Sequence, residues 1–176
     1  MNIENQLFTI SVYTENNIGL LNRVSAIFQR RGINIESLNI SPSEIEGVAK
    51  FTIVVNMAED NVKKIIGQLE KQVEVIKAYY HDLDNIIYQI SGLFKIKSEL
   101  LFEERQIQNI IKESNARIVT VNKDFFVLEK SGKKDEIVEL YNQLSVFGIM
   151  QYTRSGLIGI TKEEMKISTL LETYNN

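Results

Sequence analysis

The residues best suited to chemistry lie in a short polar stretch, Asn16-Asn17-Ile18-Gly19, directly before an amphipathic helical pattern. Backbone N–H groups in the first turn of a helix have no partner inside the helix and lie at the positive end of its dipole. A carboxylate fits such a place, and a side chain at Gly19 would block its approach. Asn16 or Asn17 can cap the helix or bind a ligand, because an amide both donates and accepts hydrogen bonds.

A free amino acid needs both kinds of partner, since its carboxylate requires donors and its ammonium requires acceptors. Asn34, just past the helical pattern, offers another amide, and Ile18, Leu20 and Ile35 are candidates for an apolar wall around an aliphatic side chain. The alternative is purely structural: the asparagines form a turn and cap, and Gly19 relieves crowding. The spacing by itself favours this structural role over an effector site.

A catalytic site is not expected. His81, the only histidine, falls in a polar stretch where an exposed or structurally bonded ring is expected. The glutamates at 103–104 and 163–164 are adjacent in helical patterns, so each pair diverges around the helix and forms no acid/base dyad. Residues 131–136, SGKKDE, lack the glycine pattern of a phosphate loop and fit a helix start, and Ser155 has no histidine near it in sequence. No histidine and carboxylate cluster has metal-ligand spacing.

Composition excludes further classes of protein. The 176 residues include 20 basic and 23 acidic side chains, which gives a net charge of −3. The basic residues are scattered, so the sequence shows no cluster of positive charge that would neutralise the phosphates of a nucleic acid. The chain has no cysteine, which excludes disulfides and thiolate metal sites. No signal-peptide pattern is visible, and no apolar run approaches the roughly 18 residues of a membrane span. We expect a soluble, cytoplasmic protein that binds neither membrane nor nucleic acid.

The first half of the chain predicts the order β-α-β-β-α-β. Apolar residues alternate over 7–13 and then recur at helical spacing from Leu20 to Phe28, in the stripe Leu20, Leu21, Val24, Ile27 and Phe28. Gly32 ends this helix, and the strand over 33–41 changes its apolar phase near Glu36 and Ser37, which indicates a bulge before the only proline, Pro42.

The remaining elements of the first half are a strand around 51–55, a helix over 62–69 that Asp60 can cap, and a strand over 73–80. This order is that of the ferredoxin-like fold, an antiparallel four-stranded sheet with both helices on one face.

The same order recurs after residues 81–85, which are polar and predict a linker. The second series consists of a strand over 86–97 with a bulge at Gly92, one helix over 100–111, strands over 116–121 and 125–130 around a turn, a helix with the stripe Ile137, Val138, Tyr141 and Leu144, and a last strand over 149–160. The fold class expected is therefore α+β, with two ferredoxin-like domains in tandem. Their ranges are 1–80 and 86–162, and 163–176 form a C-terminal helix or tail.

The segment from Asn16 to Glu44 resembles the start of the regulatory small subunit of acetolactate synthase, also called acetohydroxyacid synthase. The resemblance rests on the asparagine followed by Gly19 and Leu20, on the run RVSAIFQRRGINIESL at 23–38, and on the short Ser-Pro connection after it. The second half agrees more loosely, through Arg154-Ser155-Gly156 and Gly159. The resemblance covers roughly residues 5–162.

This resemblance implies that the first domain is an ACT domain, which pairs with a second copy and binds an amino acid at the seam. The family's effector is usually valine, sometimes leucine or isoleucine. By position, Asn16, Gly19 and Leu20 match the helix-start part of the effector site, and Asn34 and Ile35 match the part offered by the partner copy.

The family also implies a role within a larger enzyme. The subunit binds the catalytic large subunit, raises its activity and makes it sensitive to feedback inhibition in branched-chain amino acid biosynthesis. Thiamine diphosphate, Mg and FAD are implied for that catalytic partner and no cofactor for this chain, which is expected to form a homodimer or larger assembly. The alternative is a stand-alone ACT-type amino-acid sensor that controls a different partner.

Three segments depart from the family's pattern: Ile18 stands where a small residue or proline is more usual, the connection at 43–50 is shorter, and the strand at 86–97 lacks the usual charged residues.

Overall fold

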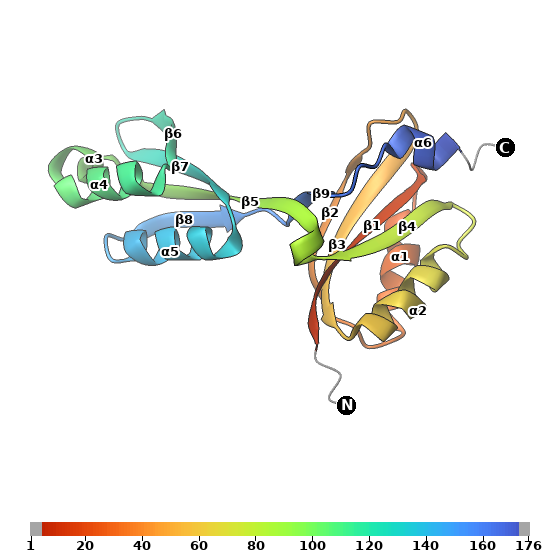
Figure 1. Cartoon of the computed structure of the whole chain (residues 1–176). Helices are drawn as coiled ribbons and strands as arrows, with labels where there is room; N and C mark the ends of the chain where they lie inside the picture. The colour runs from red at the N-terminus through yellow and green to blue at the C-terminus, as the bar shows by residue number, and fades with distance from the viewer. Residues whose placement is uncertain (1–4, 173–176) are drawn as a thin grey trace. The chain divides into compact units, whose positions relative to one another are not determined.

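The computed structural model describes residues 5–172 and divides into two compact units (Figure 1). The first unit holds the described residues up to Ile87 together with those from Leu157 onward, and the second unit is Tyr88–Gly156. The chain therefore leaves the first unit and returns to it, whereas the sequence predicted one domain after the other with a boundary near residue 162. No helix in the described range is long and apolar enough to cross a membrane.

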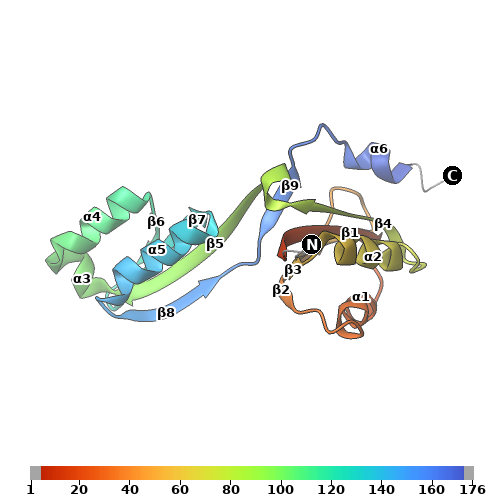
Figure 2. The ribbon, with the colours of Figure 1, turned by 60° about the horizontal axis from the view of Figure 1, so that its bottom comes forward.

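The first unit is built on a four-stranded antiparallel sheet in the order β2-β3-β1-β4. Its strands are β1 (Gln6–Glu15), β2 (Ile35–Pro42), β3 (Val48–Met57) and β4 (Val75–Asp82), and its two long helices are α1 (Leu20–Gln29) and α2 (Glu59–Leu69). Both helices cover one face of the sheet (Figure 2). The predicted β-α-β-β-α-β order is confirmed.

The core of the first unit lies between this sheet face and the two helices. Alternate residues of β1, namely Phe8, Ile10 and Val12, are fully buried there, as their period of two predicted. The α1 stripe is confirmed except for Leu21, which is 44% exposed. The predicted bulge in β2 is also confirmed, because its register with β3 shifts between Ile35 and Ser37.

Two local predictions in the first unit were wrong. Asp60 does not cap α2: it lies in the first turn with Glu59, and the N-cap residue is Ala58 with no side-chain hydrogen bond. The two carboxylates still favour the helix through its dipole. In the place of the predicted linker, His81 and Asp82 complete β4 and are followed by the single 3-10 turn η1 (Leu83–Asn85), which the Asp82 carboxylate stabilises by accepting from the Asn85 N–H at 2.9 Å.

The C-terminal segment belongs to the first unit. It contains β9 (Ile158–Thr161) and α6 (Ile167–Glu172), and α6 lies on the sheet face opposite α1 and α2 (Figure 2). The single last strand expected over 149–160 is therefore two strands, separated at 155–157. Leu157 and Leu171 are buried, at 6% and 4% exposure, which holds the segment against the unit.

The second unit repeats the same strand connectivity. Its sheet has the order β6-β7-β5-β8. The strands are β5 (Ile86–Lys97), β6 (Arg117–Val121), β7 (Phe125–Gly132) and β8 (Ile149–Arg154), and the helices are α3 (Ser98–Glu103), α4 (Arg105–Ser114) and α5 (Lys134–Ser145). The order β6-β7-β5-β8 places the second set of strands as β2-β3-β1-β4 places the first. The predicted tandem of ferredoxin-like domains is therefore confirmed.

Three predictions in the second unit need correction. The helix expected over 100–111 is two helices, because the backbone at Glu104 is extended (ψ 98°). Gly92 forms no bulge, since β5 pairs with β7 without a break through it; a Cβ there would lie 3.0 Å from Ile137 Cγ2, so the glycine allows α5 to pack closely. The buried face of α5 is Ile137, Leu140 and Leu144, while Val138 and Tyr141 are about 40% exposed.

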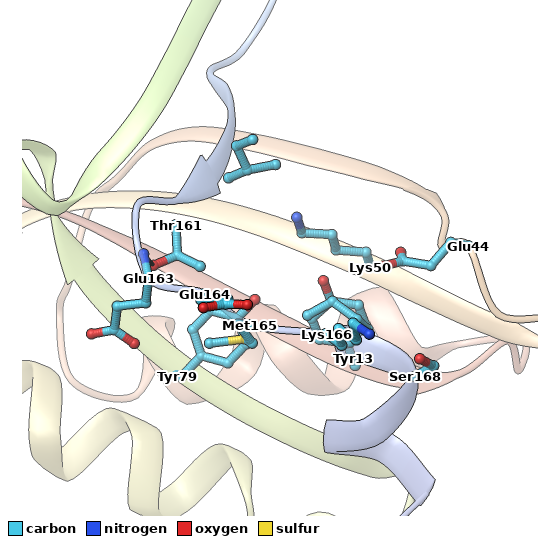
Figure 3. Close-up of a pocket in the computed structure, with 12 residues that line it drawn as sticks. Tyr13, Glu44, Lys50, Tyr79, Thr161, Glu163, Glu164, Met165, Lys166 and Ser168 are labelled. Carbon is cyan, nitrogen blue, oxygen red and sulfur yellow. Dashed lines mark hydrogen bonds between the residues drawn. The ribbon is translucent and has the colours of Figure 1, made fainter.

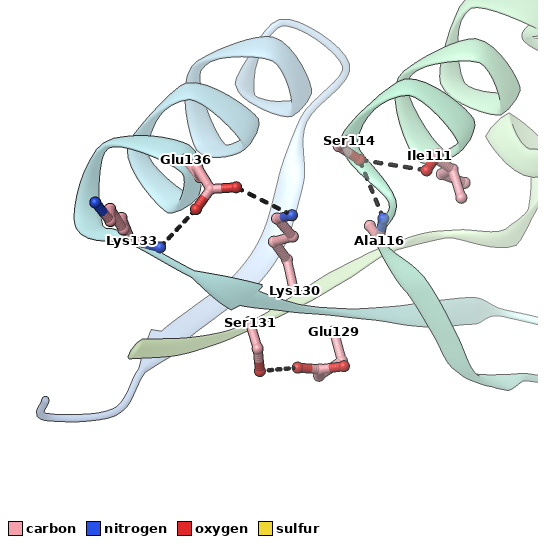
Figure 4. A network of polar contacts seen from close by, with 8 residues as sticks. All are labelled: Ile111, Ser114, Ala116, Glu129, Lys130, Ser131, Lys133 and Glu136. Atoms are coloured by element: carbon pink, nitrogen blue, oxygen red, sulfur yellow. Dashed lines mark hydrogen bonds and ion pairs between the residues drawn. The ribbon is translucent and has the colours of Figure 1, made fainter. Parts of the chain in front are cut away.

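The start of α5 confirms that SGKKDE is a helix start. The Glu136 carboxylate accepts from the Lys133 backbone N–H at 2.7 Å and pairs with Lys130 Nζ at 3.4 Å (Figure 4). The backbone hydrogen bond, more than the nearby lysines, lowers the pKa of Glu136.

Ser155 also has a structural role: its hydroxyl accepts from the Ser91 N–H at 2.9 Å and donates to the Gly156 carbonyl at 2.8 Å.

Candidate functional site

The loop between β1 and α1 holds the predicted effector residues. The Asn16 N–H donates to the Gly47 carbonyl at 3.0 Å, which fixes the loop to the β2–β3 connection. The Asn17 N–H donates to the Glu15 carbonyl at 3.0 Å, and its side-chain amide donates to the Glu15 carboxylate at 2.9 Å. Asn16 and Asn17 are both exposed.

The start of α1 is open. Gly19 is the N-cap residue, no side chain caps the helix, and the Arg23 N–H reaches the Gly19 carbonyl at 3.4 Å. The N–H groups of the first turn therefore have no intrahelical partner. Neither asparagine side chain accepts a hydrogen bond from them, although the purely structural role required such a cap. This end of the unit also carries the ion pair between Arg23 and Glu74.

Gly19 is required by the backbone. Its φ is +84°, a left-handed conformation that side chains disfavour. An added Cβ would meet nothing within 4 Å, so the glycine does not relieve crowding in a single chain. The space beyond it is open, which is what a ligand that approaches the backbone at this point requires.

The apolar residues near Gly19 divide into two groups. Ile18 is fully exposed and Leu21 is 44% exposed, whereas the side chain of Leu20 is buried in the core at 4%. Leu20 can therefore offer a ligand its backbone N–H, but not the apolar wall expected of it. Ile40, on β2, is a further exposed apolar side chain at 42%.

Asn34 and Ile35 lie at the other end of α1. Both β1 and β2 are antiparallel to β3, so β2 begins at the sheet end where β1 begins, while Gly19 follows the end of β1. The ten residues of α1, about 15 Å at 1.5 Å each, separate the two sites. Asn34 is exposed and donates to the Glu36 carboxylate at 3.3 Å, and Ile35 packs partly against the core. One chain alone does not bring Gly19 and Asn34 to the same ligand.

The other candidate residues form no catalytic constellation. The His81 ring packs edge-to-face on Tyr79 at 5.4 Å, and its Nε2 atom is buried with no hydrogen-bond partner in the described part of the chain. Within residues 5–172 there is no group of three histidine, aspartate or glutamate side chains that could hold a metal ion. Glu163 and Glu164 lie between β9 and α6, outside any helix, and line a cavity with Tyr13 and Lys50 that the sequence analysis missed. No sequence signal pointed to it, because Lys50 falls in the segment 43–50 that was expected to be a connection.

Two regions of the chain match known families. Residues 10–77 match the family described as the AHAS small subunit-like ACT domain, and residues 90–163 match the family described as the small subunit of acetolactate synthase.

Similar proteins include the acetolactate synthase small subunits of Mycobacterium leprae and Bacillus subtilis. The first is 31% identical over 162 residues, which is 92% of this chain and 95% of that protein. The second is 31% identical over 148 residues, which is 84% of this chain and 86% of that protein. The crystal structure of the acetolactate synthase small subunit from Thermotoga maritima has a TM-score of 0.81 at 22% identity, and the match covers 91% of this chain and 99% of that one. This structural likeness supports the fold of both units.

Proposed function

The chain belongs to the family of acetolactate synthase small subunits. We propose that it activates the catalytic large subunit and makes that subunit sensitive to inhibition by a branched-chain amino acid, of which valine is the first candidate. Thiamine diphosphate, Mg and FAD would be held by the catalytic subunit, while this chain contributes regulation. The observation that carries the proposal is the uncapped start of α1 at Gly19, in a region that matches the AHAS small subunit-like ACT domain.

The chemistry of the loop fits an amino-acid head group. Uncapped N–H groups at the positive end of the α1 dipole suit a carboxylate. The amide oxygens of Asn16 and Asn17, together with the Glu15 carboxylate, offer acceptors for an ammonium group. Ile18 is free to contact an aliphatic side chain.

A second copy completes the proposed site. β2 is an edge strand, and α1 crosses from central β1 to this edge. A two-fold axis beside β2 would bring the Gly19 end of one copy against the Asn34 end of the other and would create two equivalent seams. The exposed apolar side chains of Leu21 and Ile40 belong to α1 and β2, the two elements that such pairing would cover.

Inhibition would follow from differential affinity. Valine that binds one arrangement of the paired copies more tightly shifts the attached catalytic subunit toward its less active state. A coupling free energy of about 1–3 kcal/mol, typical of allosteric proteins, corresponds to roughly 5- to 150-fold in affinity.

The test is acetolactate formation by the catalytic subunit with and without this chain, titrated with valine. Gly19→Leu should abolish inhibition and leave activation largely intact, because the new side chain occupies the space open to the ligand.

Gly148→Leu is the matched control, because Gly148 has φ +86°, close to the +84° of Gly19, an equally open surrounding and a place in the other unit. It should keep valine sensitivity despite similar backbone strain. Full valine sensitivity of Gly19→Leu would refute the assigned site. A chain that binds valine but leaves acetolactate formation unchanged would instead be a sensor for another partner.

A further inference from the structure

The outer face of the first sheet and the C-terminal segment line a cavity of about 580 Å³ that is open to solvent on one side, within the size range of small-molecule sites (Figure 3). Its sheet side is formed by Tyr13, Lys50 and Tyr79, which lie on the neighbouring strands β1, β3 and β4. Tyr13 and Lys50 are direct cross-strand partners, and Tyr13 stacks on Tyr79 at 6.1 Å between ring centroids. Three adjacent strands therefore provide a rigid wall.

Lys50 is the polar centre of this wall. Its ammonium lies 5.7 Å from the centroid of the Tyr13 ring and donates to the Gly159 carbonyl at 3.4 Å, which is a long hydrogen bond. Burial lowers the pKa of Lys50, and the carboxylate of Glu44 opposes that shift. An ammonium has three donors, so a half-buried one with a single long hydrogen bond in the described part of the chain has capacity for a further acceptor.

The C-terminal segment gives the cavity its apolar side. Ile160 comes from β9, Met165 from the connection after it, and Ile167 from the start of α6. The carboxylates of Glu44, Glu163 and Glu164 also line the cavity, as does a second lysine, Lys166. These carboxylates disfavour a multiply charged anion, because like charges repel, whereas a single carboxylate can pair with Lys50.

We propose that this cavity binds a small aliphatic monocarboxylate, with its carboxylate on Lys50 Nζ and its hydrocarbon part against Ile160, Met165 and Ile167. The site is distinct from the seam at Gly19, which lies beyond the end of β1 and does not line the cavity. Its C-terminal wall also extends past residue 163, where the matched family region ends.

Methyl NMR of the full chain labelled at the methionine methyl groups tests the proposal, with isovalerate as the probe. The chain has four methionines; Met165 lines the cavity, while Met57 is in the core of the first unit and Met150 is on β8 of the second unit. Isovalerate should shift the Met165 signal saturably and leave that of Met150 unchanged. Intermolecular NOEs from the isovalerate methyls to Met165 should place the ligand without any substitution.

Charge recognition is tested by ligand and by variant. Isovaleramide, which keeps the shape and loses the charge, should bind at least about tenfold more weakly, and Lys50→Gln should weaken isovalerate to a similar degree. Lys50→Arg keeps the cation and should bind within a few fold of the unmodified chain. Lys95→Gln is the matched control, because Lys95 also lies over an aromatic ring, that of Phe125 at 4.0 Å, but in the second unit.

Valine tests whether the natural ligand is an amino acid or a carboxylic acid without an ammonium group. A Met165 shift with valine equal to that with isovalerate indicates an amino acid, and a weaker shift indicates a simple carboxylic acid. A wild-type chain without a saturable Met165 shift would overturn the proposal. Equal binding of isovalerate and isovaleramide would do the same, as would a Lys50→Gln variant that binds like wild type. None of these outcomes depends on the effector seam, which valine inhibition of the catalytic subunit tests separately.

Discussion

The sharpest test of the proposed effector seam is complementation between two defective chains. In one copy, Gly19 and Asn34 lie at opposite ends of α1, about 15 Å apart along the helix. A seam formed about a two-fold axis takes Gly19 from one copy and Asn34 from the other. Gly19→Leu should abolish valine inhibition, and Asn34→Ala should weaken valine binding by about 1–3 kcal/mol if it leaves a charged partner unpaired.

A mixed dimer of these two variants behaves differently from either parent. One of its seams carries both substitutions, and the other carries neither. Random exchange of equal amounts makes about half of the dimers mixed, so about a quarter of all seams are intact. The mixture should therefore recover roughly a quarter of wild-type valine binding sites, whereas a site within one chain would recover none.

The assay measures acetolactate formation and valine binding by calorimetry after the variants have been co-expressed. Each variant mixed with itself is the control: Gly19→Leu alone should stay insensitive, and Asn34→Ala alone should show only its weakened valine binding. If the mixed sample binds no more valine than its parents, although mass spectrometry shows mixed dimers, the two-copy seam is refuted.

Two further predictions concern the second unit. Gly92→Ala should destabilise it by about 1–3 kcal/mol in urea unfolding, because the new Cβ would lie 3.0 Å from Ile137 Cγ2; an unchanged midpoint would contradict the close packing. Glu136→Ala should cost about 1 kcal/mol by removing the acceptor for the Lys133 N–H, and Glu136→Gln, which keeps an acceptor, should cost less. The pKa of Glu136 is lowered in the folded chain. Its contribution to the stability of the fold is therefore complete above the pKa of the unfolded chain, about 4.3, and is lost as the pH falls through the pKa of the folded chain. Thermal unfolding followed by circular dichroism should therefore show a smaller effect of Glu136→Ala at acidic than at neutral pH, and a pH-independent difference would contradict this linkage.

Much of the fold could be predicted from local pattern. The alternation at Phe8, Ile10 and Val12 predicted a strand buried on one face, and the phase slip near Glu36 predicted the β2 bulge, because side chains of a strand point alternately to its two faces. Helix ends were less predictable. The break at Glu104 and the start of α2 at Glu59 depend on backbone angles that neighbouring side chains do not dictate.

The role of each glycine was harder to predict than its presence. Gly92 suggested a bulge, but it is needed because α5 packs its Ile137 against β5, a contact between residues 45 positions apart. Gly19 was expected to leave room, and it also adopts a left-handed backbone that the sequence did not specify.

The sequence alone determined the two ferredoxin-like units and the polar stretch before α1, because periodicity and turn chemistry are local properties of the chain. Only the tertiary structure decided that Gly19 and Asn34 lie at opposite ends of α1, and that residues 157–172 return to line a cavity with Lys50 on the outer face of the first sheet. Both depend on which distant segments pack together, and that is fixed by the burial of side chains across the whole chain, beyond the reach of any short window of sequence.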